Sequence, residues 1–234
     1  MKRFYKDVTS AAADGGFGIF LDGKALKTPA GQTLIVASAA LADALAEEWA
    51  AQEDIIVPAS MQLMQLVSTA IDRMNLTRGQ VTGYLVGFGG SDVLCYRAEA
   101  PMDLAALQAK HWQPWLDWAA EELGAPLGVA VGVTPVVQDE ASLAILRARI
   151  EAYDDWTMTA LQSLAPCLGS LVLALAVVEG KLDAAAAFDL AHLDENFQNQ
   201  RWGTDDDAKA RTAGLRAEVL AAARMLELIK AGRE

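Results

Sequence analysis

The sequence predicts an α+β protein in which a small N-terminal domain of antiparallel strands and helices precedes a larger, all-helical bundle domain. Short apolar runs separated by turn residues fill the first part of the chain, a pattern typical of strands joined by hairpins. Apolar residues then recur every three or four positions, as on the buried face of a helix. The chain has 234 residues, enough for two domains, and we place these at residues 1–76 and 77–234.

Three apolar runs near the N-terminus predict strands, over residues 18–21, 24–26 and 33–36. Asp22 and Gly23 separate the first two runs, and Asp-Gly in this position favours a two-residue hairpin turn. Residues 93–96 predict one further strand within the helical part of the chain. They follow a glycine cluster at 87, 89 and 90, which indicates a turn or close packing. Residues 124–135 predict a loop or a short extended segment.

Helices are expected over most of the remaining chain, at residues 39–52, 61–74, 103–123, 139–164, 169–179, 183–202 and 205–229. Some polar residues before these segments are candidate N-caps: Ser38, Asp103, Asp139, Asp183 and Thr204. Thr204 with Asp207 resembles a capping box. The segment 169–179 is almost entirely apolar, which indicates a helix at the centre of the bundle.

Composition and charge exclude several classes of function. The chain carries 19 Lys and Arg against 31 Asp and Glu, a net charge of −12, so we expect neither nucleic acid nor an anionic membrane as a partner. Its longest apolar run is too short to span a bilayer. Two histidines cannot form a three-histidine zinc site, and the two cysteines form no Cys-x-x-Cys motif. We therefore expect a soluble, cytoplasmic protein with no metal, cofactor or small-molecule substrate.

Two motif-like patterns do not support catalysis. Residues 18–24 resemble a phosphate-binding loop, but the next residue is Ala25, which has no hydroxyl for magnesium, and no helix is expected to follow. Cys95 and His111 are the other candidates, as a nucleophile and its base. Cys95 lies in an apolar run, where cysteines are usually inert core residues. The sequence therefore favours a binding protein over an enzyme.

The segment 192–203 carries the main candidate binding surface. On a helix, Glu195, Gln198 and Trp202 lie on one face, and Asp194 and Arg201 lie on an overlapping polar face. Such a surface is either a solvated helix face with a local ion pair or a binding surface in which Trp202 is the anchor. Asp194 and Glu195 diverge by about 100° on a helix, so they do not face one substrate as a catalytic pair.

Three tryptophans lie on one predicted helix. Trp115 and Trp118 share a face, and Trp112 precedes Trp115 by three residues. Packing between helices is the default interpretation of this spacing. The alternative is an exposed aromatic patch for a protein partner.

Several motifs occur in a specific order along almost the whole chain. They are Lys-Arg-Phe-Tyr-Lys at 2–6, Leu-Asp-Gly-Lys at 21–24, Leu-Lys-Thr-Pro at 26–29, Glu-Trp at 48–49, Thr-Ala-Ile-Asp at 69–72, Asp-Val-Leu-Cys-Tyr-Arg-Ala at 92–98, Ser-Leu-Val-Leu-Ala at 170–174, Leu-Asp-Glu at 193–195 and Trp-Gly at 202–203. With this order and spacing, the chain resembles the assembly chaperones of ATP synthase that bind the free alpha subunit of the catalytic head.

The resemblance implies a chaperone that holds the unassembled alpha subunit and prevents its aggregation until a partner subunit replaces it, without hydrolysing ATP. It also implies a β-containing N-terminal domain and a helical C-terminal domain. It favours the segment 192–203 as the contact with the client, with Glu195 first and Asp194, Gln198, Arg201 and Trp202 around it. We expect a monomer when the protein is free. The expected location is the bacterial cytoplasm, or the mitochondrial matrix for a trimmed eukaryotic form.

Two other functions remain open from the sequence alone. One is a hydrolase that uses Asp194 or Glu195, and a deep pocket around a carboxylate with a strongly shifted pKa would favour it. The other is a permanent subunit of a larger complex, which a large exposed apolar surface would favour.

Overall fold

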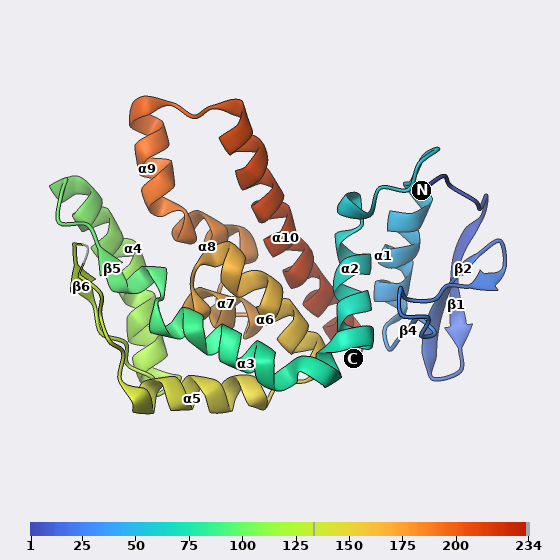
Figure 1. Ribbon diagram of the computed structural model, residues 1–234, viewed down its shortest axis with the longest axis horizontal. Helices are drawn as coiled ribbons and strands as arrows, with labels where there is room; N and C mark the ends of the chain where they lie inside the picture. Colours follow the sequence, from blue (N-terminus) through green and yellow to red (C-terminus); the bar gives the residue numbers. More distant parts are fainter. Residues whose placement is uncertain (133, 233–234) are drawn as a thin grey trace. The chain divides into compact units, whose positions relative to one another are not determined.

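The computed structural model describes residues 1–132 and 134–232, in which the chain forms two compact units (Figure 1). Unit 1 contains Met1–Thr77, Asp155–Ala160 and the segment from Ala221 onward, and unit 2 contains Arg78–Asp154 and Leu161–Leu220. A division at residue 76 would assign both later segments to the helical domain, whereas the structure groups them with unit 1. The α+β fold class is confirmed, because antiparallel strands and helices precede a region that is mostly helical.

The sheet of unit 1 is antiparallel, with β2 at its centre. Its strands are β1 (Val8–Ala13), β2 (Gly16–Leu21), β3 (Lys24–Ala25) and β4 (Ile35–Val36), and β2 pairs with each of the others. The predicted hairpin turn is confirmed, because Asp22 and Gly23 have φ angles of 48° and 76°, as a two-residue type I′ turn requires. A Cβ atom at Gly16 would lie 2.4 Å from the carbonyl oxygen of Val36, so glycine is required there.

Two helical layers follow this sheet. Helix α1 (Ala39–Ala50) packs against β1 and β2, and in Figure 1 it lies between the sheet and α2 (Gln62–Thr69). Ser38 is its N-cap, as predicted, since the Ser38 Oγ accepts a hydrogen bond from the Leu41 amide at 3.3 Å. Pro58 opens the 3₁₀ turn η1 (Pro58–Ser60), and α2 continues directly into the π-helical turn η2 (Ala70–Met74).

The C-terminal part of α10 (Asp206–Ala231) belongs to unit 1. The Ser38 hydroxyl donates a hydrogen bond to the carbonyl oxygen of Leu228 at 2.6 Å. A Cβ atom at Gly232 would lie 2.7 Å from the Cβ of Ser38, so the absence of a side chain permits this close approach. The residue that caps α1 is therefore also bonded to the last turns of α10.

Unit 2 is built around α7. Its elements are, wholly or in part, α3 (Asn75–Gly90), η3 (Val93–Cys95), β5 (Tyr96–Arg97), α4 (Met102–Glu121), β6 (Ala130–Val131), α5 (Glu140–Glu151), α6 (Asp155–Leu168), α7 (Leu171–Val178), α8 (Ala184–Ala191), α9 (Leu193–Trp202) and α10. Every side chain of α7 is buried, which confirms the predicted central apolar helix. Strands β5 and β6 form a short parallel pair.

A buried carboxylate caps two of these elements at once. Asp92 is fully buried and accepts hydrogen bonds from the Leu94 amide (3.1 Å), the Val172 amide (3.0 Å) and the Ser170 hydroxyl (2.9 Å). It therefore holds the first turn of η3 and the first turn of α7 together. Burial raises the pKa of Asp92 to about 6, and the three donors oppose this rise only in part.

Two predicted helices are each interrupted. The predicted helix 139–164 is α5 followed by α6, and the predicted helix 183–202 is α8 followed by α9. Tyr153 lies at the first interruption, where its hydroxyl bonds to Glu179. His192 lies at the second, with its Nδ1 3.0 Å from the Phe188 carbonyl oxygen and its ring stacked on the Phe188 ring at 4.0 Å. The apolar periodicity continues through both interruptions, so it did not reveal them.

Other predicted boundaries are also wrong. The strand expected at 93–96 starts only at Tyr96, because Asp92 caps a 3₁₀ turn over the preceding residues. Asp103 lies within the first turn of α4, not before it. Asp205, not Thr204, accepts the hydrogen bond from the Ala208 amide at the start of α10, at 2.7 Å.

The glycine cluster lies inside α3 and not in a turn. A Cβ atom at Gly89 would lie 3.1 Å from the Cδ1 of Leu146, so this glycine permits close packing, which was the other interpretation of the cluster. Strand β6 lies within the segment 124–135, which was predicted to be a loop or extended; residue 133 of that segment is outside the described residues.

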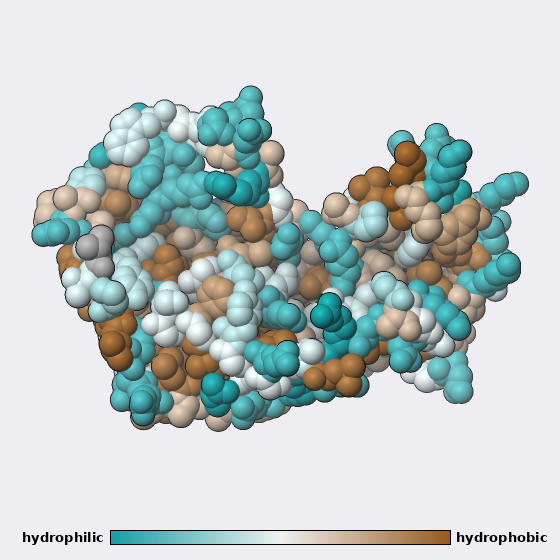
Figure 2. All heavy atoms as spheres, viewed as in Figure 1, coloured by the Kyte–Doolittle hydropathy of each residue, from teal (hydrophilic) through white to brown (hydrophobic). Residues whose placement is uncertain are grey.

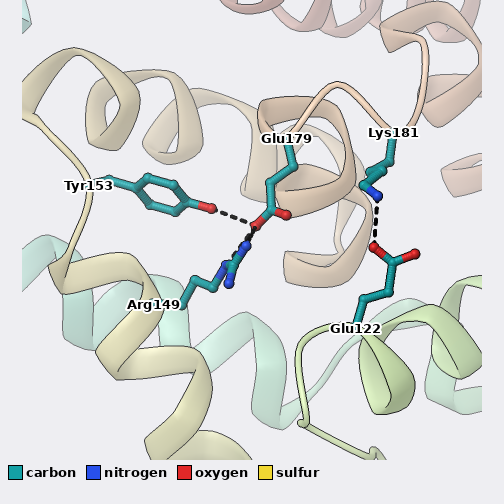
Figure 3. A network of polar contacts seen from close by, with 5 residues as sticks. All are labelled: Glu122, Arg149, Tyr153, Glu179 and Lys181. Atoms are coloured by element: carbon teal, nitrogen blue, oxygen red, sulfur yellow. Dashed lines mark hydrogen bonds and ion pairs between the residues drawn. The ribbon is translucent and has the colours of Figure 1, made fainter.

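A polar network lies at the C-terminal end of α7 (Figure 3). Glu179 accepts the Tyr153 hydroxyl at 2.8 Å and pairs with the Arg149 guanidinium at 2.6 Å, while Lys181 pairs with Glu122 at 2.7 Å. Burial, and after it the Glu179 carboxylate, raise the pKa of Tyr153 to about 12, so this phenol remains a hydrogen-bond donor. The network therefore fixes the residues between α5 and α6 beside the end of α7.

Candidate functional site

The predicted tryptophan cluster belongs largely to the core of unit 2. Trp112 is fully buried, Trp118 is buried, and Trp115 meets Trp118 edge to face with ring centroids 6.2 Å apart. The Trp112 Nε1 donates a hydrogen bond to the Leu190 carbonyl oxygen at 2.9 Å. This confirms the packing interpretation and links α4 to the end of α8.

Helix α9 carries the whole predicted binding surface, and it packs against α4 and α8. The predicted residues are Asp194, Glu195, Gln198, Arg201 and Trp202. The structure separates them into residues that hold α9 in place and residues that remain open to a partner.

Asp194 belongs to the first group. Its Oδ1 accepts a hydrogen bond from the Gln108 Nε2 at 2.7 Å, and Gln108 is fully buried on α4. The Gln108 Oε1 accepts the Ala98 amide at 2.7 Å, and Arg97 donates to the Gln108 carbonyl oxygen at 2.6 Å. The Arg97 guanidinium lies 5.4 Å from the centroid of the Trp112 ring. Asp194 therefore joins α9 to a buried polar network.

Arg201 also holds α9 in place. It forms an ion pair with Asp103, in the first turn of α4, and its guanidinium lies 4.2 Å from the centroid of the Phe197 ring. Both partners of this ion pair are partly exposed, so it contributes little free energy but fixes the end of α9 relative to α4.

Glu195, Gln198 and Trp202 form the second group, which we call the α9 surface. Glu195 is half-buried. Among the described residues its carboxylate accepts one long hydrogen bond, from the Thr212 hydroxyl on α10 at 3.5 Å, so it keeps most of its acceptor capacity. Gln198 is exposed, and Trp202 has 77% of its surface exposed. In Figure 2 hydrophilic and intermediate colours prevail over α9, so this face is polar around one large aromatic side chain.

This arrangement gives no support to catalysis by the two adjacent carboxylates. Asp194 bonds to α4 and Glu195 faces α10, so they do not converge on one substrate. The buried thiols of Cys95 and Cys167 are not activated nucleophiles, because burial raises the pKa of each to about 12.

Among the residues that the structure describes, no group of three or more His, Cys, Asp and Glu side chains is placed to hold a metal ion. None of the described helices is long and apolar enough to cross a membrane.

Sequence reasoning missed Gln108 and Arg97 as the residues that position α9. One signal was available: Gln108 lies four residues before Trp112, on the apolar face of its helix. A polar residue on a buried helix face needs a partner, but the sequence alone could not identify that partner as Asp194.

Replacing Gln108 with leucine tests its role. The change removes the bond to Asp194 and leaves the Ala98 amide without its acceptor, so we expect unit 2 to lose about 2 kcal/mol of unfolding free energy. Amide hydrogen exchange in α9 should become faster than in the wild type. Lys110→Leu on the same helix is the matched control, since Lys110 is exposed and should leave α9 protected. Unchanged exchange in α9 of the Gln108→Leu variant would contradict this role.

Comparisons with known proteins give a consistent result. A family model described as "ATP12 chaperone protein" matches residues 2–120. The crystal structure of Atp12 from Paracoccus denitrificans is similar, with a TM-score of 0.89 and 41% identity, over 97% of this chain and 98% of that one. A protein of Agrobacterium tumefaciens described as a candidate chaperone has the same TM-score and identity, over 97% of this chain and 85% of its own. The mitochondrial protein atp12 of Schizosaccharomyces pombe is 26% identical in an alignment 219 residues long, which covers 88% of this chain and 75% of that protein.

Proposed function

Because this chain belongs to the ATP12 chaperone family, we propose that it binds the unassembled alpha subunit of ATP synthase and keeps it from aggregating until a partner subunit takes its place. Family membership itself gives the coarser function, a chaperone for ATP synthase assembly. A subunit of a ring exposes, before assembly, surface that its neighbours later cover, and such surface aggregates. A chaperone that covers this surface must bind specifically and must also be released.

The observation that carries the proposal is the α9 surface. It combines a carboxylate with spare acceptor capacity, an exposed amide and an exposed tryptophan, on a helix that Asp194 and Arg201 hold in a fixed position. A large aromatic anchor surrounded by polar groups is typical of a reversible protein interface. The polar groups remain hydrated when the surface is free, so dissociation at the α9 surface exposes no large apolar area there.

We infer that release is driven by the incoming subunit and not by ATP hydrolysis in this chain. Residues 18–24, which resemble a phosphate-binding loop, form a strand and a hairpin turn, with no helix N-terminus behind them. We also infer a bacterial cytoplasmic location, which the Paracoccus and Agrobacterium relatives support. The mitochondrial relative makes the mitochondrial matrix the alternative.

Co-expression with the ATP synthase alpha subunit of the same organism tests this function. The amount of soluble alpha subunit should rise several-fold, and the two chains should elute together in gel filtration. Adding the beta subunit should then displace the chaperone from the complex. If the alpha subunit aggregates equally with and without this chain, the proposed function is wrong; if the complex persists after addition of the beta subunit, the chain is a permanent subunit and not a chaperone.

A further inference from the structure

Unit 1 contains an apolar groove that the α9 surface does not involve. Its volume is about 610 Å³. The N-terminal segment, the connection after β3, α1 and the α2–η2 helix all contribute to its walls. The apolar residues that matter most here are Phe4, Trp49, Ile56, Pro58, Met61 and Met64.

The groove exposes apolar surface that a partner can cover. Phe4, on its rim, has 63% of its surface exposed, and Figure 2 shows hydrophobic residues gathered at the surface of unit 1 beside the N-terminus. Met61 and Met64 provide flexible, polarisable side chains that adapt to different apolar partners. The groove therefore offers mainly apolar contacts.

Two cations also line this groove. Lys27 and Arg73 are both exposed, and neither takes part in an ion pair among the described residues. The one carboxylate in the lining, Asp72, is already occupied by the Thr28 hydroxyl at 2.5 Å and the Ala30 amide at 3.1 Å. With Asp72 included, the side chains of the lining carry a net formal charge of +1, and in a chain of net charge −12 this local positive excess favours an occupant that carries negative charge.

We propose that this groove binds an extended segment of the client polypeptide that has apolar side chains and at least one carboxylate. The apolar side chains lie against Phe4, Trp49 and the methionines, and the carboxylate pairs with Lys27 and Arg73. This inference rests on the proposed function, because the occupant is a segment of the protein that the chaperone holds. It gives unit 1 a binding role of its own.

Photo-crosslinking in the complete complex tests the proposal. Phe4 is replaced by photoreactive benzoylphenylalanine, the chain is co-expressed with the alpha subunit, and the complex is irradiated after gel filtration. The crosslink should join Phe4 to an apolar segment of the alpha subunit that contains Asp or Glu, as identified by mass spectrometry. A complex that forms but gives no crosslink from this position, or gives one only to a segment without a carboxylate, overturns the groove proposal and leaves the proposed function intact.

Reversing the charge of both Lys27 and Arg73 provides a second test of the groove proposal. Lys27→Glu with Arg73→Glu should weaken alpha-subunit binding by about tenfold or more and reduce the crosslink in parallel. Lys24→Glu with Lys230→Glu is the matched control, because both lysines are exposed in unit 1, lie outside the groove and change the net charge equally. Equal binding by the two double variants overturns the proposal. If the wild-type chain forms no complex at all, the proposed function fails and the groove proposal fails with it.

Discussion

Replacing Asp92 with alanine is expected to lower the unfolding free energy by about 3 kcal/mol at pH 5. The change leaves the Leu94 amide, the Val172 amide and the Ser170 hydroxyl buried without their acceptor. Each such group costs about 1–3 kcal/mol. Urea denaturation followed by circular dichroism measures the loss. Asp139→Ala is a suitable control, since it removes a single cap at an exposed helix start and should cost about 1 kcal/mol.

The Asp92→Asn variant tests the charge of the same site through its pH dependence. Burial raises the pKa of Asp92 to about 6, against an ordinary value of 3.8. The stabilisation from the protonated carboxyl is therefore complete below about pH 3.8 and is lost as the pH rises through 6. Between pH 4 and pH 7 the unfolding free energy of the wild type should fall relative to that of Asp92→Asn, by up to about 3 kcal/mol. A difference that stays constant, or rises with pH, would show that Asp92 remains ionised in the folded state.

Replacing Glu195 with lysine is expected to weaken binding of the alpha subunit by about thirtyfold or more. Glu195 has the weakest internal hydrogen bond of the acidic residues on α9, so its carboxylate is the one available to a partner. Reversing its charge places a cation where the client presents a donor, which both removes a contact and adds repulsion. Isothermal titration calorimetry, or the yield of soluble alpha subunit in co-expression, measures the effect.

Glu121→Lys is the matched control for this charge reversal. Glu121 is exposed, lies in the last turn of α4 and makes no ion pair among the described residues. Both variants should retain the thermal stability of the wild type, since neither carboxylate is bound to a buried network. If Glu195→Lys and Glu121→Lys bind the alpha subunit equally well, Glu195 is not part of the client contact.

The sequence predicted those parts of the fold that depend on local chemistry. The hairpin at Asp22-Gly23, the cap at Ser38 and the apolar helix α7 follow from turn geometry, a side-chain acceptor and an uninterrupted apolar run. The interruptions at Tyr153 and His192 were missed because the apolar spacing continues on both sides of them. The predictions that failed are therefore those for which a local signal in the sequence was absent or misleading.

The candidate site shows the same division. Helical periodicity alone places Glu195, Gln198 and Trp202 on one face of a helix, so the sequence predicted that these three residues lie together. The different role of Asp194 was not predictable, since its partner Gln108 is 86 positions away. The groove of unit 1 was missed for a related reason. It is assembled from segments that are separate in sequence, and none of them has a distinctive pattern by itself.

The bond between Ser38 and Leu228 has a consequence for how this protein is made. Unit 1 combines strands and a helix from early in the sequence with the last turns of α10, which are translated much later. During translation, β1, β2 and α1 must therefore wait for these last turns before the cap at Ser38 has all of its contacts. A chain whose translation stops before α10 lacks part of unit 1.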